Sequence, residues 1–124
     1  MRLIVSLLVI ILILEIGYAV DVDACQLINA PGTYEVTANL NGANQVTPNM
    51  NSIVRTCIAI TSDNVIFDCM GIYDINNSGI NWASGIAVYN GGEGGPSNVT
   101  IRNCRNISNY RIGKIGRASC RERV

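Results

Sequence analysis

The sequence contains no histidine, and this absence excludes several kinds of active site. Histidine is the usual general base near neutral pH and the commonest protein ligand of transition metals. A Ser-His-Asp triad, a Cys-His pair and a histidine-ligated metal centre therefore cannot be built from this chain. The sequence also lacks a close CxxC pair, so we expect neither a thiolate metal site nor a resident cofactor.

Charged residues are few, and basic residues form no cluster in the central part of the chain. Residues 20–114 carry five Lys or Arg against seven Asp or Glu, a slightly acidic balance. Nucleic acids and anionic membranes are bound through clustered Lys and Arg side chains, which displace counterions. We therefore expect no nucleic-acid partner, and contact with a membrane only during export.

Aromatic residues make up only 6% of the chain, whereas asparagine and glycine are abundant. Both of these residue types adopt positive φ readily and favour tight turns. The composition therefore predicts short strands joined by sharp corners, without long helices.

The first 19 residues are typical of a secretory signal peptide. Arg2 precedes an apolar run, Leu3 to Leu14, that only Ser6 interrupts, and Gly17 and Ala19 fit the small-residue cleavage rule. An uncleaved membrane anchor is the alternative, but the run is shorter than the ~20 residues that span a bilayer. We expect a helical signal peptide over residues 1–19, with cleavage after Ala19 or, as the alternative, after Ala24. The protein is then exported, and is extracellular or at the cell surface.

The last ten residues, 115–124, differ abruptly in composition from the Asn- and Gly-rich sequence before them. They resemble the translation of a common sequencing adapter read as coding DNA. A basic arm for nucleic acid is the alternative, because three arginines lie there. We expect residues 113–124 to be an artefactual tail, and the natural protein to continue beyond Ile112 with further repeats.

Four cysteines remain outside that tail: Cys25, Cys57, Cys69 and Cys104. Export permits disulfides, and four cysteines allow three pairings that spacing alone cannot distinguish. We predict that Cys69 and Cys104 are small buried apolar residues at equivalent positions of two repeats. A disulfide between Cys25 and Cys57 is a weaker prediction.

Two segments of the chain are imperfect copies of each other: Asp63 to Cys69 and Ser97 to Cys104. Such self-similarity indicates short units that become stable by stacking on one another. Alternation places Val65, Phe67 and Cys69 inward, with Asp68 outward. In the second copy it places Val99, Ile101 and Asn103 inward, although one extra residue before Cys104 requires a bulge or a corner. Asn64 and Asn98 are predicted to form a ladder at the bend before each strand.

Other strands are expected on both sides of the first copy. Residues 32–40 alternate so that Tyr34, Val36, Ala38 and Leu40 share one face, and residues 41–51 are predicted to be a loop. Three short strands, in residues 58–60, 65–69 and 72–75, make up one turn of the repeat. We expect the first turn to be incomplete, and loops at residues 76–84 and 91–96.

The segments Asn64 to Gly71 and Asn98 to Ile107 resemble the right-handed parallel β-helix, or pectin-lyase-like, superfamily, particularly exported members whose coils read "NVTI" then "NC" or "DC". The resemblance covers roughly residues 25–110. It implies an all-β solenoid, here two to three coils over residues 20–112. Proteins of this style include polysaccharide lyases and hydrolases, epimerases, adhesins and carbohydrate-binding modules.

Catalytic members of the superfamily carry acidic residues, sometimes with calcium, and an Arg or Lys base on the outside of one sheet. Asp63, Asp68, Asp74 and Arg102 are the residues that could correspond, but no motif transfers a catalytic role to any of them. We therefore expect a non-catalytic exported module that binds carbohydrate or another cell surface. Trp82 and Tyr89 are the candidate stacking residues. The alternative is the N-terminal piece of a polysaccharide lyase or glycoside hydrolase whose active coils, with any calcium, lie further on.

Overall fold

The computed structural model describes residues 17–46, 55–77, 83–89, 95–110 and 112–116. These residues form strands and no helix, which confirms the all-β prediction for the described part of the chain. No helix in those ranges is long and apolar enough to cross a membrane. The strands are β1 (Val20–Val22), β2 (Gln26–Ile28), β3 (Gly32–Val36), β4 (Leu40–Asn41), β5 (Gln45–Val46), β6 (Arg55–Ile60), β7 (Val65–Asp68), β8 (Asp74–Asn76), β9 (Ala83–Val88), β10 (Val99–Arg102), β11 (Asn106–Ser108) and β12 (Ile112–Gly116).

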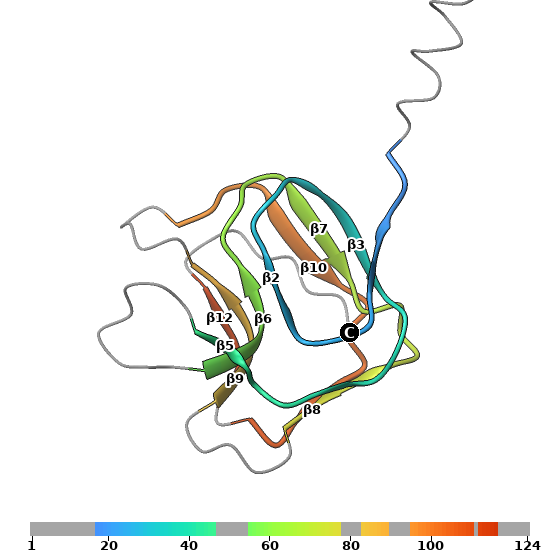
Figure 1. Cartoon of the computed structure of the whole chain (residues 1–124), viewed down its shortest axis with the longest axis vertical. Helices are drawn as coiled ribbons and strands as arrows, with labels where there is room; N and C mark the ends of the chain where they lie inside the picture. Colours follow the sequence, from blue (N-terminus) through green and yellow to red (C-terminus); the bar gives the residue numbers. More distant parts are fainter. Residues whose placement is uncertain (1–16, 47–54, 78–82, 90–94, 111, 117–124) are drawn as a thin grey trace, which may run out of the picture.

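The strands make three sheets whose pairings are parallel, apart from one short antiparallel addition. The sheet orders are β1-β3-β7-β10, β11-β8-β4 and β12-β9-β6-β2, and β5 pairs with β6 in the antiparallel direction. From β2 onward the chain visits the three sheets in a constant order, and β1 precedes this series as an edge strand beside β3. We call each passage a circuit: β2-β3-β4, then β6-β7-β8, then β9-β10-β11, after which β12 returns to the sheet of β9. Figure 1 shows the three sheets surrounding a common interior.

The two copies recognised in the sequence lie side by side in the predicted register. Val99 pairs with Val65 and Ile101 with Phe67, in parallel strands. The preceding circuit adds Tyr34 beside Phe67, so these positions stack through three circuits. All five side chains are buried. Burying a side chain of this size contributes about 1.5 to 3 kcal/mol, so the stacks account for much of the stability of the fold.

The first circuit is complete, contrary to the prediction, because it contains one strand of each sheet. The continuous strand expected over residues 32–40 is instead divided. β3 ends at Val36, β4 begins at Leu40, and Ala38 between them is only partly buried. The chain turns a corner there, so the alternation of one strand does not carry through. Part of the predicted loop 41–51 is also extended, since β5 pairs with β6.

Two corners after the repeated strands correct the sequence reading. Met70 and Gly71 have φ of +65° and +71°, and Ile72 is 63% exposed, so β8 begins only at Asp74. Asn103, predicted to point inward, is exposed at a corner with φ of +56°. Left-handed residues turn the backbone sharply, and asparagine tolerates this conformation well. The extra residue of the second copy therefore lies in the corner and leaves the strand register intact.

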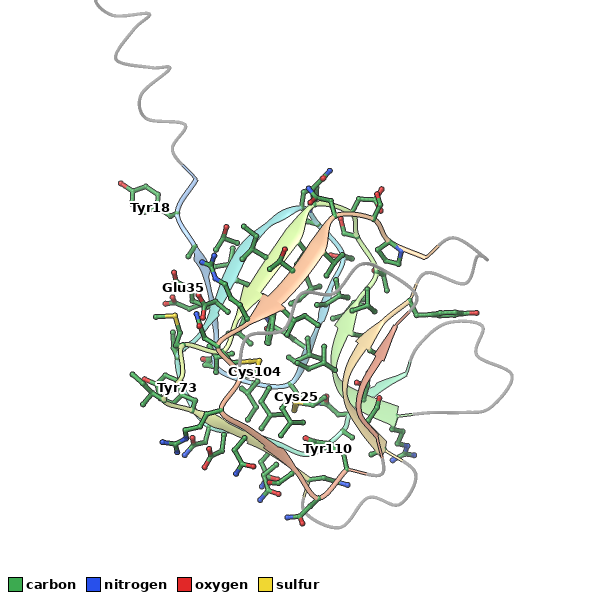
Figure 2. The ribbon with its side chains drawn as sticks, turned by 180° about the vertical axis from the view of Figure 1, so that it is seen from behind. Tyr18, Cys25, Glu35, Tyr73, Cys104 and Tyr110 are labelled. Carbon is green, nitrogen blue, oxygen red and sulfur yellow. A yellow bond between two sulfur atoms is a disulfide. The ribbon has the colours of Figure 1, made fainter. Side chains whose placement is uncertain are left out.

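Two disulfides connect successive circuits. Cys25 bonds to Cys57, as predicted, and Cys69 bonds to Cys104, which contradicts the prediction that these two are free thiols. Their Cα atoms are 4.7 Å apart because they occupy neighbouring circuits at about the spacing of paired strands. Cys25 and Cys104 both lie inside the ring of sheets in Figure 2. Each circuit described is thus covalently tied to the next.

Candidate functional site

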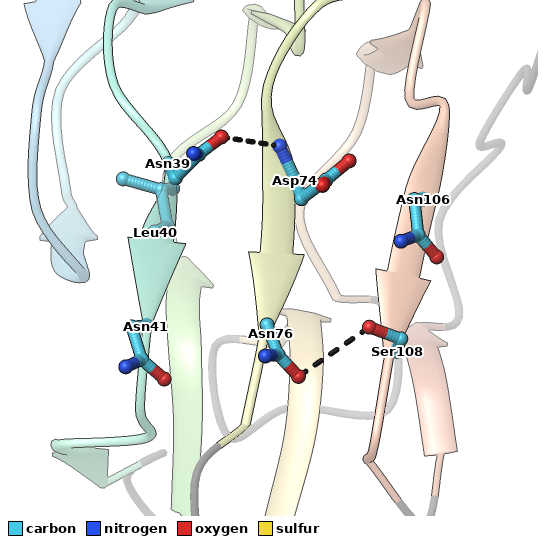
Figure 3. A pocket seen from close by; sticks show the side chains of 7 residues that line it. All are labelled: Asn39, Leu40, Asn41, Asp74, Asn76, Asn106 and Ser108. Carbon is cyan, nitrogen blue, oxygen red and sulfur yellow. Dashed lines mark hydrogen bonds between the residues drawn. The ribbon is translucent and has the colours of Figure 1, made fainter.

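The outer face of the smallest sheet carries a shallow polar groove of about 230 Å³. Its residues come from one strand of each circuit, β4, β8 and β11, and from the residue before β4. They are Asn39, Leu40, Asn41, Asp74, Asn76, Asn106 and Ser108. Figure 3 shows these side chains across the three strands. We call this surface the amide groove.

Strand alternation explains why polar groups gather on this face. Leu40 pairs with Ile75, and both side chains are buried in the core. Their immediate neighbours in the strands must then point to the opposite side, outward. Because the strands are in register, Asn41, Asn76 and Ser108 form one row across the sheet. The sequence positions of these two apolar residues thus determine which face carries the polar ones.

Hydrogen bonds hold part of the groove in place. The backbone N–H of Asp74 donates to Oδ1 of Asn39 at 3.0 Å. Oδ1 of Asn76 accepts hydrogen bonds from Oγ of Ser108 at 3.4 Å and from Nδ2 of Asn109 at 2.7 Å. These contacts connect neighbouring circuits, so they fix the spacing between polar groups as well as their orientation. Figure 3 draws the first two of them.

Two amides of the groove remain available. Within the described residues, the side chains of Asn41 and Asn106 make no hydrogen bond, and both residues are exposed. A carboxamide offers two N–H donors and one acceptor oxygen. The groove therefore presents unused donors and acceptors at its two outer strands, beside the fixed amide of Asn76.

One ion pair borders the groove. Nη2 of Arg105 lies 3.2 Å from Oδ1 of Asp74, and both side chains are substantially exposed. Asp74 is the only ionisable residue that lines the groove in the described part of the chain. An exposed pair of this kind contributes little to stability, typically below about 1 kcal/mol. The pair matters instead for ligand binding, because it determines the charge at this edge of the groove.

Tyr110 supports the groove from the inner side of the sheet (Figure 2). Its hydroxyl oxygen lies 2.7 Å from the carbonyl oxygen of Gly42 and 3.0 Å from that of Asn76, so its one proton is shared between acceptors at the ends of β4 and β8. Burial disfavours the phenolate and raises the pKa of Tyr110 to about 12. The hydroxyl therefore stays protonated, and remains a donor, well above neutral pH.

Among the acidic residues nominated from the sequence, Asp68 is the most enclosed, although alternation placed it outward. Nε of Arg102 lies 2.8 Å from its Oδ2, and Nδ2 of Asn103 and the backbone N–H of Met70 donate to its Oδ1 at 3.1 Å and 2.8 Å. Burial alone would raise the pKa of Asp68, but these hydrogen bonds outweigh it, and the pKa is lowered. Arg102 and Asn103, in the next circuit, cover the carboxylate and account for its burial.

The structure does not assemble the nominated residues into one catalytic site. Asp68 and Arg102 come together, but Asp63 accepts a hydrogen bond from the backbone N–H of Ser97 at 2.7 Å, and Asp74 pairs with Arg105. Each aspartate thus has a different partner that connects two circuits. Among the described residues, no three His, Cys, Asp or Glu side chains are grouped so that they could hold a metal ion.

The remaining predicted site residues lie in the core, at a corner or outside the described ranges. Val65, Phe67, Val99, Ile101, Cys69 and Cys104 are buried. Asn64 and Asn98 are exposed at the corner before β7 and β10, where Nδ2 of Asn98 donates to Oδ1 of Asn64 at 2.8 Å. Tyr89 follows β9 and is half-buried, and its N–H donates to the carbonyl of Ile60. Trp82 lies outside the described residues.

The sequence reading missed the amide groove, although it contained a signal for it. Polar residues flank Leu40, Ile75 and Ile107 on both sides, in three segments that belong to successive circuits. The sequence pattern places two of these segments wholly or partly in loops or corners, so it does not reveal that the three segments share one face of a sheet.

Comparison of the chain with models of protein families, with curated proteins and with solved structures gave no match.

Proposed function

We propose that the chain folds as a right-handed parallel β-helix, of the pectin-lyase-like style. Three circuits through the same three sheets, with parallel pairing between successive circuits, support this proposal. The buried stacks and the two disulfides between circuits are further support, because a solenoid is stabilised mainly by contacts between neighbouring repeats.

We further propose that the protein is exported and binds carbohydrate without transforming it. The two disulfides suit an oxidising compartment, where such bonds persist. Export also agrees with the signal peptide predicted over residues 1–19. The protein would then meet polysaccharides or surface glycans outside the cell.

The observation that carries the binding proposal is the amide groove with its unused amides on Asn41 and Asn106. Sugar hydroxyls both donate and accept hydrogen bonds, and carboxamides complement them in both directions. Polar groups on successive strands of a sheet recur at about 4.8 Å. A row of this kind on a rigid sheet can contact several sugars at once.

A non-catalytic role is favoured because the nominated carboxylates serve as ties between circuits. Asp68 is held by three donors, and its lowered pKa makes it a poor general base. The alternative, a polysaccharide lyase or hydrolase whose active coils lie further along the chain, stays a prediction that no observation in the described residues favours.

Isothermal titration of the exported, disulfide-bonded chain with soluble neutral polysaccharides (a β-glucan, a xylan and a mannan) tests the proposal. We expect binding to at least one polymer, and loss of most of that binding in the double variant Asn41→Ala/Asn106→Ala. The matched control is Thr33→Ala/Thr100→Ala, which alters the outer face of the neighbouring β3-β7-β10 sheet. Binding that survives in the first variant, or disappears equally in the second, would remove the amide groove as the binding site.

A further inference from the structure

The charge of the amide groove is set by a single carboxylate. Asn39, Asn41, Asn76, Asn106 and Ser108 are neutral at every pH at which the fold is expected to persist, so Asp74 alone gives the described lining a charge. No lysine or arginine is among the described lining residues. The described cation that contacts the groove is Arg105, through its ion pair with Asp74, and Arg105 also lines a second hollow with Met70 and Gly71.

Arg105 is already engaged by Asp74. Its Nη2 lies 3.2 Å from Oδ1 of Asp74, which leaves Oδ2 of that carboxylate without a described partner. A negatively charged sugar would have to approach this carboxylate and also compete with it for the guanidinium. The negative charge of the sugar is repelled by the carboxylate of Asp74, which opposes binding. If Arg105 stays with Asp74, the charged group of the sugar loses its hydration in the groove without gaining a counter-charge.

A neutral sugar meets neither obstacle. Its hydroxyls can donate to Oδ2 of Asp74 and exchange hydrogen bonds with the amides of Asn41 and Asn106. A hydrogen bond to an ionised acceptor is stronger than one between neutral groups. The carboxylate of Asp74 thus attracts sugar hydroxyls and repels the carboxylates and sulfates of acidic sugars, so it favours neutral sugars over acidic ones.

We propose that the amide groove selects neutral polysaccharides and rejects polyuronates and sulfated glycans, and that Asp74 is the residue that sets this preference. This inference rests on the proposed carbohydrate-binding function and names the ligand class of that same groove. The Asp74–Arg105 pair then acts as a charge filter, because it keeps Arg105, the one cation described beside the groove, from binding an acidic ligand.

The test compares the affinity of the full exported chain for a neutral polysaccharide with its affinity for polygalacturonate, at low and at high NaCl. We expect the wild-type protein to prefer the neutral polymer, with an affinity that salt does not change. In Asp74→Asn, Arg105 is released and the repelling charge is lost. The ratio of polygalacturonate to neutral affinity should rise roughly three- to fivefold, the scale of one exposed charge interaction, and high salt should abolish the gain.

Arg105→Gln is the second variant, because it keeps Asp74 and removes its partner. The ratio of polygalacturonate to neutral affinity should not rise in this variant, and thermal unfolding of both variants should stay close to that of the wild type, since the pair is exposed. Wild-type binding to polygalacturonate that equals binding to the neutral polymer would overturn the charge filter alone. An unchanged ratio in Asp74→Asn would do the same. Absence of binding to either polymer would overturn the carbohydrate-binding function together with it.

Discussion

Nδ2 of Asn98 donates a hydrogen bond to Oδ1 of Asn64 at 2.8 Å, across the same corner of two successive circuits. The two residues share the left-handed conformation, with φ of +55° and +57°. The backbone of Asn64 is bonded to both neighbouring circuits as well, because its N–H donates to the carbonyl of Ser97 and its carbonyl accepts from the N–H of Gly32. The corner is therefore repeated from circuit to circuit by both side chains and backbone.

The first prediction concerns this corner. Asn64→Leu should lower the free energy of unfolding by about 1 to 2 kcal/mol, because a branched side chain tolerates positive φ poorly and the hydrogen bond to Asn98 is lost. Asn64→Gly is the matched control, since it removes the same hydrogen bond and relieves the backbone cost. Chemical denaturation should rank the proteins wild type, then Gly, then Leu. A Leu variant as stable as the wild type would contradict the role of the corner.

The second prediction concerns pH. The pKa of Asp68 is lower in the folded protein than the ordinary aspartate value of 3.8. Its contribution to stability is therefore full above about pH 4 and is lost as the pH falls through the lowered pKa, because the unfolded chain takes up the proton first. Denaturation midpoints measured from pH 6 down to pH 2 should fall more steeply for the wild type than for Asp68→Asn. Parallel curves would show that the Arg102 and Asn103 contacts do not favour the ionised form.

The third prediction concerns the disulfide between Cys69 and Cys104, which are 35 residues apart. Replacing both cysteines by alanine should lower the free energy of unfolding by about 2 to 4 kcal/mol, chiefly because the unfolded chain gains freedom. Intact mass before and after thiol labelling of the denatured, unreduced wild-type protein should show neither residue modified. Labelling of both thiols under these conditions would contradict the pairing.

The fourth prediction concerns Tyr110, whose hydroxyl joins the ends of β4 and β8. Because its pKa is raised from 10.0 to about 12, its stabilising effect should be complete below about pH 10 and lost as the pH rises toward 12. Spectrophotometric titration should show a late ionisation step, and Tyr110→Phe should remove that step. The variant should also be less stable at neutral pH, by about 0.5 to 1.5 kcal/mol. A titration in which every tyrosine ionises near its ordinary pKa would contradict the burial of this hydroxyl.

The sequence allowed the stacking of β7 on β10 to be predicted because apolar residues recur at equivalent positions. Val65 and Phe67 in one copy correspond to Val99 and Ile101 in the other, and a slip by one residue would expose all four. The same reasoning did not predict the disulfide just beyond the strands. If the register of β7 and β10 is continued, Cys69 lies beside Asn103 and not beside Cys104. The left-handed corner at Asn103 brings Cys104 next to Cys69.

The amide groove was harder to predict because its residues come from strands of only two or three residues. Short strands carry almost no alternation, and the break between Val36 and Leu40 depends on how the first circuit packs on the second. Asp68 likewise looked exposed in its own strand, since the residues that cover it, Arg102 and Asn103, belong to the next circuit. Contacts between circuits are tertiary, and a single repeat does not contain them.

The parallel register of the two copies is the claim on which the fold, the groove and the binding proposal all depend. NMR measurement of contacts between β7 and β10 in the exported chain tests it most directly. The account predicts contacts of Val65 with Val99, of Ile66 with Thr100 and of Phe67 with Ile101. Contacts of Val65 with Arg102 and of Ile66 with Ile101, which an antiparallel pair would give, would contradict it, as would an absence of contacts between the two segments.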